Sequence, residues 1–133
     1  MTDDTIDIIR RKLAKYPQAR FVETGHSITV LPSDERGFEV GLAKRDGRMT
    51  VYFDGWHEEL DDQDQALNCF ALGLSPACRL RVEVRGHMRC KWVMEYRVDE
   101  QWYEDSTVGL LLLPFWRRPK TIYLQNQLGS VDP

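Results

Sequence analysis

The feature that most constrains the fold of this chain is an alternation of apolar and polar residues on both sides of Asp46-Gly47. An Asp-Gly pair is typical of a two-residue hairpin turn, because both residues of that turn adopt a positive φ. The large apolar residues that such a turn places opposite each other are Val40 with Phe53 and Leu42 with Val51. They share one face, so the segment predicts part of an antiparallel sheet with one buried side.

A second alternation surrounds Gly86-His87, with apolar residues at every other position from Cys78 to Val84 and from Met88 to Val98. A two-residue loop would place the two apolar rows on opposite faces, so we expect a three-residue loop over residues 86–88. The expected pairs are Val84 with Cys90, Val82 with Trp92 and Leu80 with Met94. Further strands are expected at residues 20–24, 27–31, within 101–108 and at 121–125.

Two segments have helical spacing. The first, with Ile6, Ile9, Leu13 and Tyr16 on one face, should end before Pro17. The second begins after Asp61 or Asp62, either of which can cap it. Its apolar positions are Ala66, Leu67, Phe70, Ala71 and Leu74, and Gly73 and Pro76 mark its expected end.

The order of these elements predicts a single α+β domain over residues 1–133. We expect an antiparallel sheet of about six to seven strands built from hairpins. The N-terminal helix and the central helix should pack on one face of that sheet.

The net charge of −3, from 18 basic and 21 acidic residues, argues against a protein that mainly coats nucleic acid or an anionic membrane. Three cysteines do not suit a secreted disulfide framework. The longest apolar run without a charge, residues 108–116, is shorter than the roughly 20 residues of a membrane-spanning helix. The acidic N-terminus does not resemble a secretory signal. We therefore expect a cytoplasmic protein with no membrane span.

Six carboxylates and one histidine lie within residues 54–64, which contain no Lys or Arg. Carboxylates suit hard cations and imidazole suits transition metals, so Asp54, His57 and Glu58 are candidates to bind a ligand or metal in an expected loop. The spacing matches neither an EF-hand loop nor a two-histidine metalloprotease helix. The start of a solvated helix is the alternative interpretation of the later acids in this stretch.

The second hairpin carries six basic and two acidic residues between positions 79 and 97. Its expected register places Glu83 opposite Lys91 and Glu95 opposite Arg79, which are ordinary cross-strand charge pairs. The remaining residues, Arg81, Arg85, Arg89 and Arg97, are candidates for an anion or partner patch. The basic hairpin and the acidic block either neutralise each other or form two opposed patches.

The C-terminal run around Leu110–Leu113 lacks alternation, so a strand there would need cover on both faces. One cover could be a second subunit. The alternatives are a buried strand followed by a loop and, less favoured, docking at a membrane interface, since the basic residues there, Arg117, Arg118 and Lys120, are few. The candidate interface residues are Leu111, Leu113, Phe115, Trp116 and Arg117, which include types enriched in protein interfaces.

We find no phosphate-binding loop, nucleophile elbow or CxxC motif, and we expect no catalytic residues, cofactor or metal. The favoured hypothesis is a small binding module that self-associates through its C-terminal segment. Its expected partner is a second copy of the chain or another protein, with a small-molecule ligand as an alternative. Other hypotheses are a small enzyme or metal-binding protein that uses residues 54–64, and, less favoured, anion or nucleic-acid binding by the hairpin at 79–97.

Overall fold

The computed structural model describes residues 4–110 and 114–128. The helices are α1 (Thr5–Leu13) and α2 (Gln63–Leu74). The strands are β1 (Phe21–Glu23), β2 (Ser27–Val30), β3 (Val40–Arg45), β4 (Arg48–Phe53), β5 (Trp56–Leu60), β6 (Cys78–Arg85), β7 (Met88–Val98), β8 (Gln101–Gly109) and β9 (Pro119–Gln125). Neither helix among the described residues could cross a bilayer, since both are too short.

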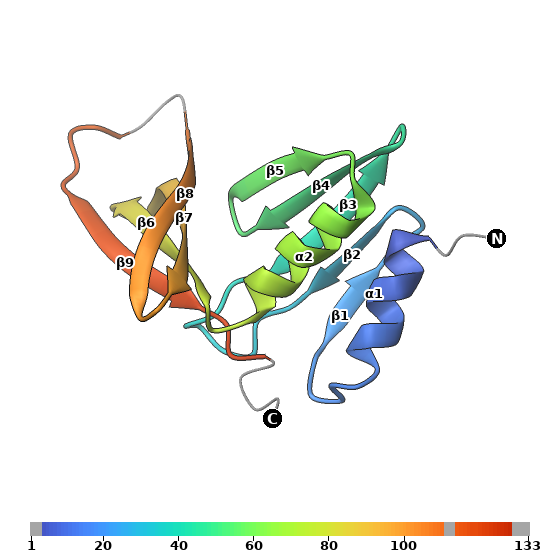
Figure 1. Cartoon of the computed structure of the whole chain (residues 1–133). Coiled ribbons are helices and arrows are strands. Elements are labelled where there is room, and N and C mark those ends of the chain that lie inside the picture. Colours follow the sequence, from blue (N-terminus) through green and yellow to red (C-terminus); the bar gives the residue numbers. More distant parts are fainter. Residues whose placement is uncertain (1–3, 111–113, 129–133) are drawn as a thin grey trace.

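The strands form two antiparallel sheets (Figure 1). The first contains five strands in the order β1-β2-β3-β4-β5, and the second contains four in the order β8-β7-β6-β9. The mixture of helices with antiparallel strands is as expected, but the expectation of one sheet with six to seven strands is wrong. Strand β5 is an edge of the first sheet and contacts β7 and β8 of the second without pairing with them.

The hairpin of β3 and β4 has the register expected from its alternation. Leu42 lies opposite Val51 and Val40 lies opposite Phe53. Asp46 and Gly47 have φ values of 51° and 78°, as a two-residue turn of this type requires. The expected strands before this hairpin are also present as β1 and β2.

The hairpin of β6 and β7 differs from the expectation at its turn. The turn has two residues, and Arg85 pairs with Met88 across it. The expected pair of Val84 with Cys90 is wrong, because Val84 lies opposite Arg89. A β-bulge at Cys90 then shifts the register by one residue, which restores the common apolar face. The pairs farther from the turn are as expected: Val82 with Trp92 and Leu80 with Met94.

Both helices lie over the same face of the five-stranded sheet (Figure 1). Helix α1 buries Ile6, Ile9 and Leu13, whereas Tyr16 lies beyond its end. Helix α2 contacts mainly β3 and β4 and begins where Asp62 accepts hydrogen bonds from the backbone N–H groups of residues 64 and 65. A single cluster of buried residues joins the helices to both sheets.

Candidate functional site: a groove between the two helices

A groove of about 720 Å³ lies between α1 and α2. The two helices are tied together at their N-terminal ends, where the Thr5 hydroxyl donates a 2.9 Å hydrogen bond to Gln63 Oε1. The two helices diverge from there (Figure 1), and the groove is lined by residues of both. The size of the groove is within the range of small-molecule and peptide-segment sites.

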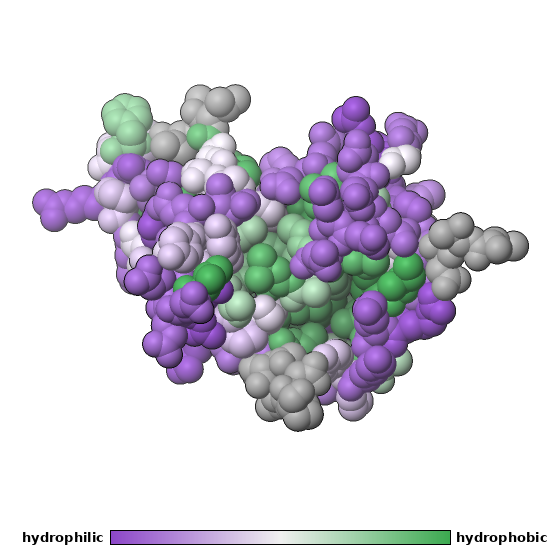
Figure 2. Space-filling view, in the orientation of Figure 1, coloured by the Kyte–Doolittle hydropathy of each residue, from purple (hydrophilic) through white to green (hydrophobic). Residues whose placement is uncertain are grey.

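The groove has an apolar floor and a polar rim. Figure 2 shows the hollow as a hydrophobic area flanked by hydrophilic residues. The apolar lining residues are Ile9, Leu13, Leu67, Phe70, Ala71, Leu74 and Leu128. The polar ones are Lys12, Lys15, Tyr16, Asp64, Asn68 and Ser75.

Helix α2 has two apolar stripes that serve different purposes. Ala66, Phe70 and Gly73 are buried. Leu67 and Leu74 are only half-buried and Ala71 is exposed, and these three line the groove. Together the six positions span roughly 160° of the helix, which is more than the roughly 100° that one sheet contact covers. This excess width is a sequence signal for the groove, although the apolar positions of α2 were expected to pack on the sheet alone.

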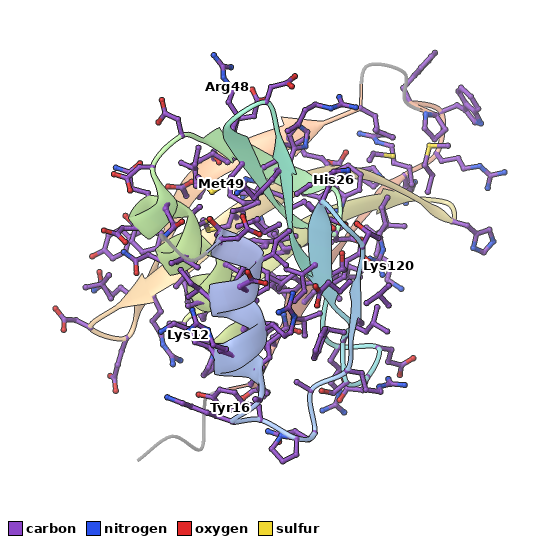
Figure 3. All side chains as sticks on the ribbon, turned by 90° about the vertical axis from the view of Figure 1, so that its right-hand side faces the viewer. Lys12, Tyr16, His26, Arg48, Met49 and Lys120 are labelled. Carbon is purple, nitrogen blue, oxygen red and sulfur yellow. The ribbon has the colours of Figure 1, made fainter. Side chains whose placement is uncertain are left out.

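The rim on the α1 side is cationic. Lys12 and Lys15 are both exposed, and neither forms an ion pair with any residue in the ranges 4–110 and 114–128. Figure 3 shows Lys12 on the side of α1 where α2 lies, with Tyr16 below the end of the helix. The other charged lining residue is Asp64, in the first turn of α2. An anionic group above the groove would therefore find two cations that no described carboxylate occupies.

The structure does not bring the three acidic-block candidates together. The expected loop is wrong, since residues 56–60 form β5. Because side chains alternate along a strand, exposed His57 and half-buried Glu58 point to opposite faces. Asp54 is in the preceding turn, where its Oδ2 accepts hydrogen bonds from Arg89 Nη1 at 2.8 Å and Trp92 Nε1 at 2.7 Å. The described residues contain no group of three or more His, Cys, Asp or Glu that could hold a metal ion.

The four arginines proposed as a patch each have an internal partner. Arg81 contacts Glu95 at 3.0 Å and also Glu104, and these carboxylates raise its pKa. Arg85 contacts Glu83 at 3.2 Å, and Arg89 contacts Asp54 at 2.8 Å. Arg97 lies over the Trp102 ring at 5.4 Å. The acidic block and the basic hairpin are thus joined at one pair, Asp54 and Arg89.

Arg79, which the sequence assigned only to a charge pair, has a more specific environment. Its guanidinium lies between the rings of Trp102 and Tyr123, 4.2 and 4.5 Å from their centroids, and its Nε is 2.6 Å from Glu95. Trp102 and Tyr123 belong to the two edge strands, so the sheet curls around this cation. These contacts link both edge strands to β6 and β7 through Arg79.

The C-terminal candidates are only partly described. Leu111 and Leu113 lie outside the described residues. Phe115 and Trp116 are 79% and 71% exposed, and Arg117 is exposed beside them.

Comparison with known proteins finds no family model, curated protein or solved structure that matches this chain.

Proposed function

We propose that this protein is a binding module that holds an amphipathic helix of another protein in the groove between α1 and α2. The observation that carries this proposal is the second apolar stripe of α2, formed by Leu67, Ala71 and Leu74. This stripe lines an open groove and is in contact with water. Removing this apolar surface from water lowers the free energy. An amphipathic helix does so by placing its own apolar side chains in the groove.

The charges at the rim indicate which helix would fit. Lys12 and Lys15 have no ion-pair partner among the described residues, so their ammonium groups are available to a bound segment. A partner helix with Glu or Asp beside its apolar stripe would pair with them. A helix with Lys or Arg at those positions would be repelled. The proposed partner is therefore an acidic amphipathic segment.

A pair of synthetic peptides tests this proposal by fluorescence anisotropy. Both have an apolar Leu and Ala stripe along one helical face. One carries Glu on the flanking positions, and the other carries Lys. We expect the Glu peptide to bind more tightly, and we expect higher salt to reduce the difference, because the rim is exposed. If neither peptide binds, or if the Lys peptide binds more tightly, the proposal is wrong.

Ala71→Arg is the variant that tests the position of the site. Ala71 is exposed and lines the groove, so the larger side chain should obstruct the groove without disturbing the core. We expect at least a tenfold loss of affinity for the Glu peptide, about 1.4 kcal/mol. Gln65→Arg is the matched control, since Gln65 is exposed on the same helix and does not line the groove. Equal affinities for the two variants would place the peptide elsewhere.

The role of the rim is tested by reversing its charge. The double variant Lys12→Glu, Lys15→Glu should invert the peptide preference, so that the Lys peptide becomes the tighter ligand. The control is Arg36→Glu, Arg45→Glu, which changes the net charge equally at exposed positions outside the groove lining. A preference that shifts equally in both double variants would reflect net charge and not this rim.

The self-association and cytoplasmic location expected from the sequence stay predictions. Sedimentation of the purified chain at several concentrations tests the first. A single monomeric species throughout would contradict it.

A further inference from the structure

One end of the four-stranded sheet gathers exposed apolar side chains and cations that form no ion pair with the described residues. Arg85 at the end of β6 lies opposite both Met88 of β7 and Pro119 of β9. Lys91 lies opposite Gly109 at the end of β8. All four strands of the sheet therefore have an end in this region. We define the basic aromatic tip as Met88, Lys91, Leu110, Phe115, Trp116, Arg117, Arg118 and Lys120.

The apolar part of the tip protrudes into solvent. Phe115 and Trp116 are the most exposed large apolar side chains among the described residues, and Met88 and Leu110 are 47% and 42% exposed. The rings of Phe115 and Trp116 pack edge to face, with centroids 5.4 Å apart. In Figure 2 an apolar group stands out at the upper left, over the segment that joins β8 to β9.

Arg85 holds this segment against the hairpin turn. Its Nη1 donates hydrogen bonds to the carbonyl oxygen of Arg117 at 2.9 Å and to that of Phe115 at 3.5 Å. The Arg117 side chain passes so close to Gly86 that a Cβ there would lie 2.7 Å from Arg117 Cδ. The backbone that carries Phe115 and Trp116 is thus held in place while their side chains face solvent. Less conformational entropy of this segment is therefore lost on binding.

The polar side chains of the tip are four cations, and Glu83, which lies opposite Lys91, is paired with Arg85 at 3.2 Å. Lys91, Arg117, Arg118 and Lys120 are exposed, and none of them forms an ion pair with a residue that the structure describes. The whole chain has a net charge of −3, so the rest of the molecule is acidic. This separation of charge would orient the tip toward a negatively charged surface.

We propose that the basic aromatic tip docks this protein on an anionic phospholipid bilayer. Phe115 and Trp116 enter the headgroup region, where aromatic side chains are favoured, while Met88 and Leu110 cover the apolar surface beside them. The four cations contact lipid phosphates and carboxylates. Each cation near such a surface strengthens binding by about fivefold. The site is separate from the groove between α1 and α2.

Two other partners fit the tip less well. A second copy related by two-fold symmetry would bring the same unpaired cations of both chains together, which is unfavourable. A single-stranded nucleic acid needs a groove with rings on which bases stack. The two rings of the tip are nearly perpendicular and highly exposed, and half of its apolar side chains are not aromatic.

Flotation with lipid vesicles tests the proposal. The full chain should float with vesicles of phosphatidylcholine that contain about 30 mol% phosphatidylserine, and not with phosphatidylcholine alone. Arg117→Glu, Arg118→Glu should lower the partition coefficient by at least about twentyfold. Phe115→Ser, Trp116→Ser should also lower it, and because both residues are exposed, this variant should stay folded by circular dichroism.

Three controls separate this surface from other causes. Val22→Ser removes an exposed apolar side chain on β1, 54% exposed, and should not affect flotation. Lys12→Glu, Lys15→Glu abolishes the cationic rim of the groove and should lower flotation much less than the change at Arg117 and Arg118. The proposal is overturned if the chain does not float with anionic vesicles or if the two tip variants float like the original chain. It is also overturned if the chain binds a single-stranded oligonucleotide more tightly than it binds the anionic vesicles, or if sedimentation shows a dimer that only the tip variants lose.

Discussion

The indole Nε1 of Trp92 donates a 2.7 Å hydrogen bond to Asp54 Oδ2, and this contact ties the β4–β5 turn of the first sheet to the second sheet. The neighbouring Gly55 lies against the same ring, since a Cβ there would be 2.3 Å from its atoms. Nearby, Trp56 Nε1 donates a 2.9 Å hydrogen bond to Ser106 of β8. This turn and the start of β5 therefore join the two sheets by specific polar contacts, and there is no space for a side chain at residue 55.

Asp54→Ala should destabilise the protein by about 1–3 kcal/mol, because it leaves the largely buried Trp92 indole N–H without its acceptor and breaks the contact with Arg89. Asp54→Asn should cost less, since an amide oxygen can still accept from Trp92 and Asn tolerates the positive φ of 54°. Urea unfolding followed by tryptophan fluorescence measures both values. Equal losses for Ala and Asn would contradict the assigned role of the acceptor.

Gly73→Ala should destabilise the protein by about 1–3 kcal/mol, although Ala favours helices over Gly by about 1 kcal/mol. A Cβ at residue 73 would lie 2.4 Å from the ring of Phe53, which is fully buried and has little room to move. The control is Gly25→Ala, because a Cβ at residue 25 meets nothing within 4 Å. Thermal unfolding of both variants tests this, and a more stable Gly73→Ala protein would show that the packing argument is wrong.

Glu58→Gln should stabilise the protein at neutral pH by about 0.5 kcal/mol. Burial, together with the nearby Asp105, raises the pKa of Glu58 above its ordinary value of 4.5. The folded protein therefore binds this proton more tightly than the unfolded chain, and stability is lost as pH rises from 4.5 through the folded pKa. The free energy of unfolding should differ between the two proteins more at pH 7 than at pH 4. Glu59→Gln, at an exposed position on the opposite face of β5, is the control.

Cys69 should react slowly with a thiol reagent at pH 8 despite its partial exposure. Burial, with smaller contributions from Glu58 and Asp105, raises the pKa of its thiol from 9.0 to about 12. Its thiolate fraction is then about a thousandfold lower than in the unfolded chain. Release of the chromophore from Ellman's reagent, with and without urea, measures the ratio. Cys69→Ser identifies the phase that belongs to this residue, and native labelling at the unfolded rate would contradict the prediction.

The β6–β7 hairpin shows how far alternation alone can predict a register. The pairing of Val82 with Trp92 is confirmed because the apolar rows require one extra residue somewhere in the hairpin. A third residue in the loop and a β-bulge in the strand both supply this extra residue, and both give the same pairs farther from the turn. The alternation therefore could not indicate that the extra residue is Cys90. The Cys90 side chain is 0% exposed, because the residues packed around the bulge cover it.

The candidate site was harder to predict than the elements that form it. Both helices and most of the groove's apolar residues were recognised, since apolar spacing along a helix is local. The groove itself exists because α1 and α2 diverge from the contact between Thr5 and Gln63. Similarly, Arg81 contacts Glu104 in addition to Glu95 of its own hairpin, and Arg89 contacts Asp54; Glu104 and Asp54 are 23 and 35 residues away in the sequence. No cross-strand rule within one hairpin could reveal those contacts.

The sequence by itself determined the types of most elements, although not of β5, together with the β3–β4 register and the positions of the helices. These depend on backbone period and turn chemistry within short segments, as at Asp46-Gly47. Only the tertiary structure decided that β5 and β6 belong to different sheets and which charges neutralise each other. It also decided which apolar side chains, such as Leu67 and Trp116, stay in contact with water. The reason is that strand pairing, ion pairing and burial depend on contacts between residues far apart in the sequence. Those contacts form only when the whole chain packs together.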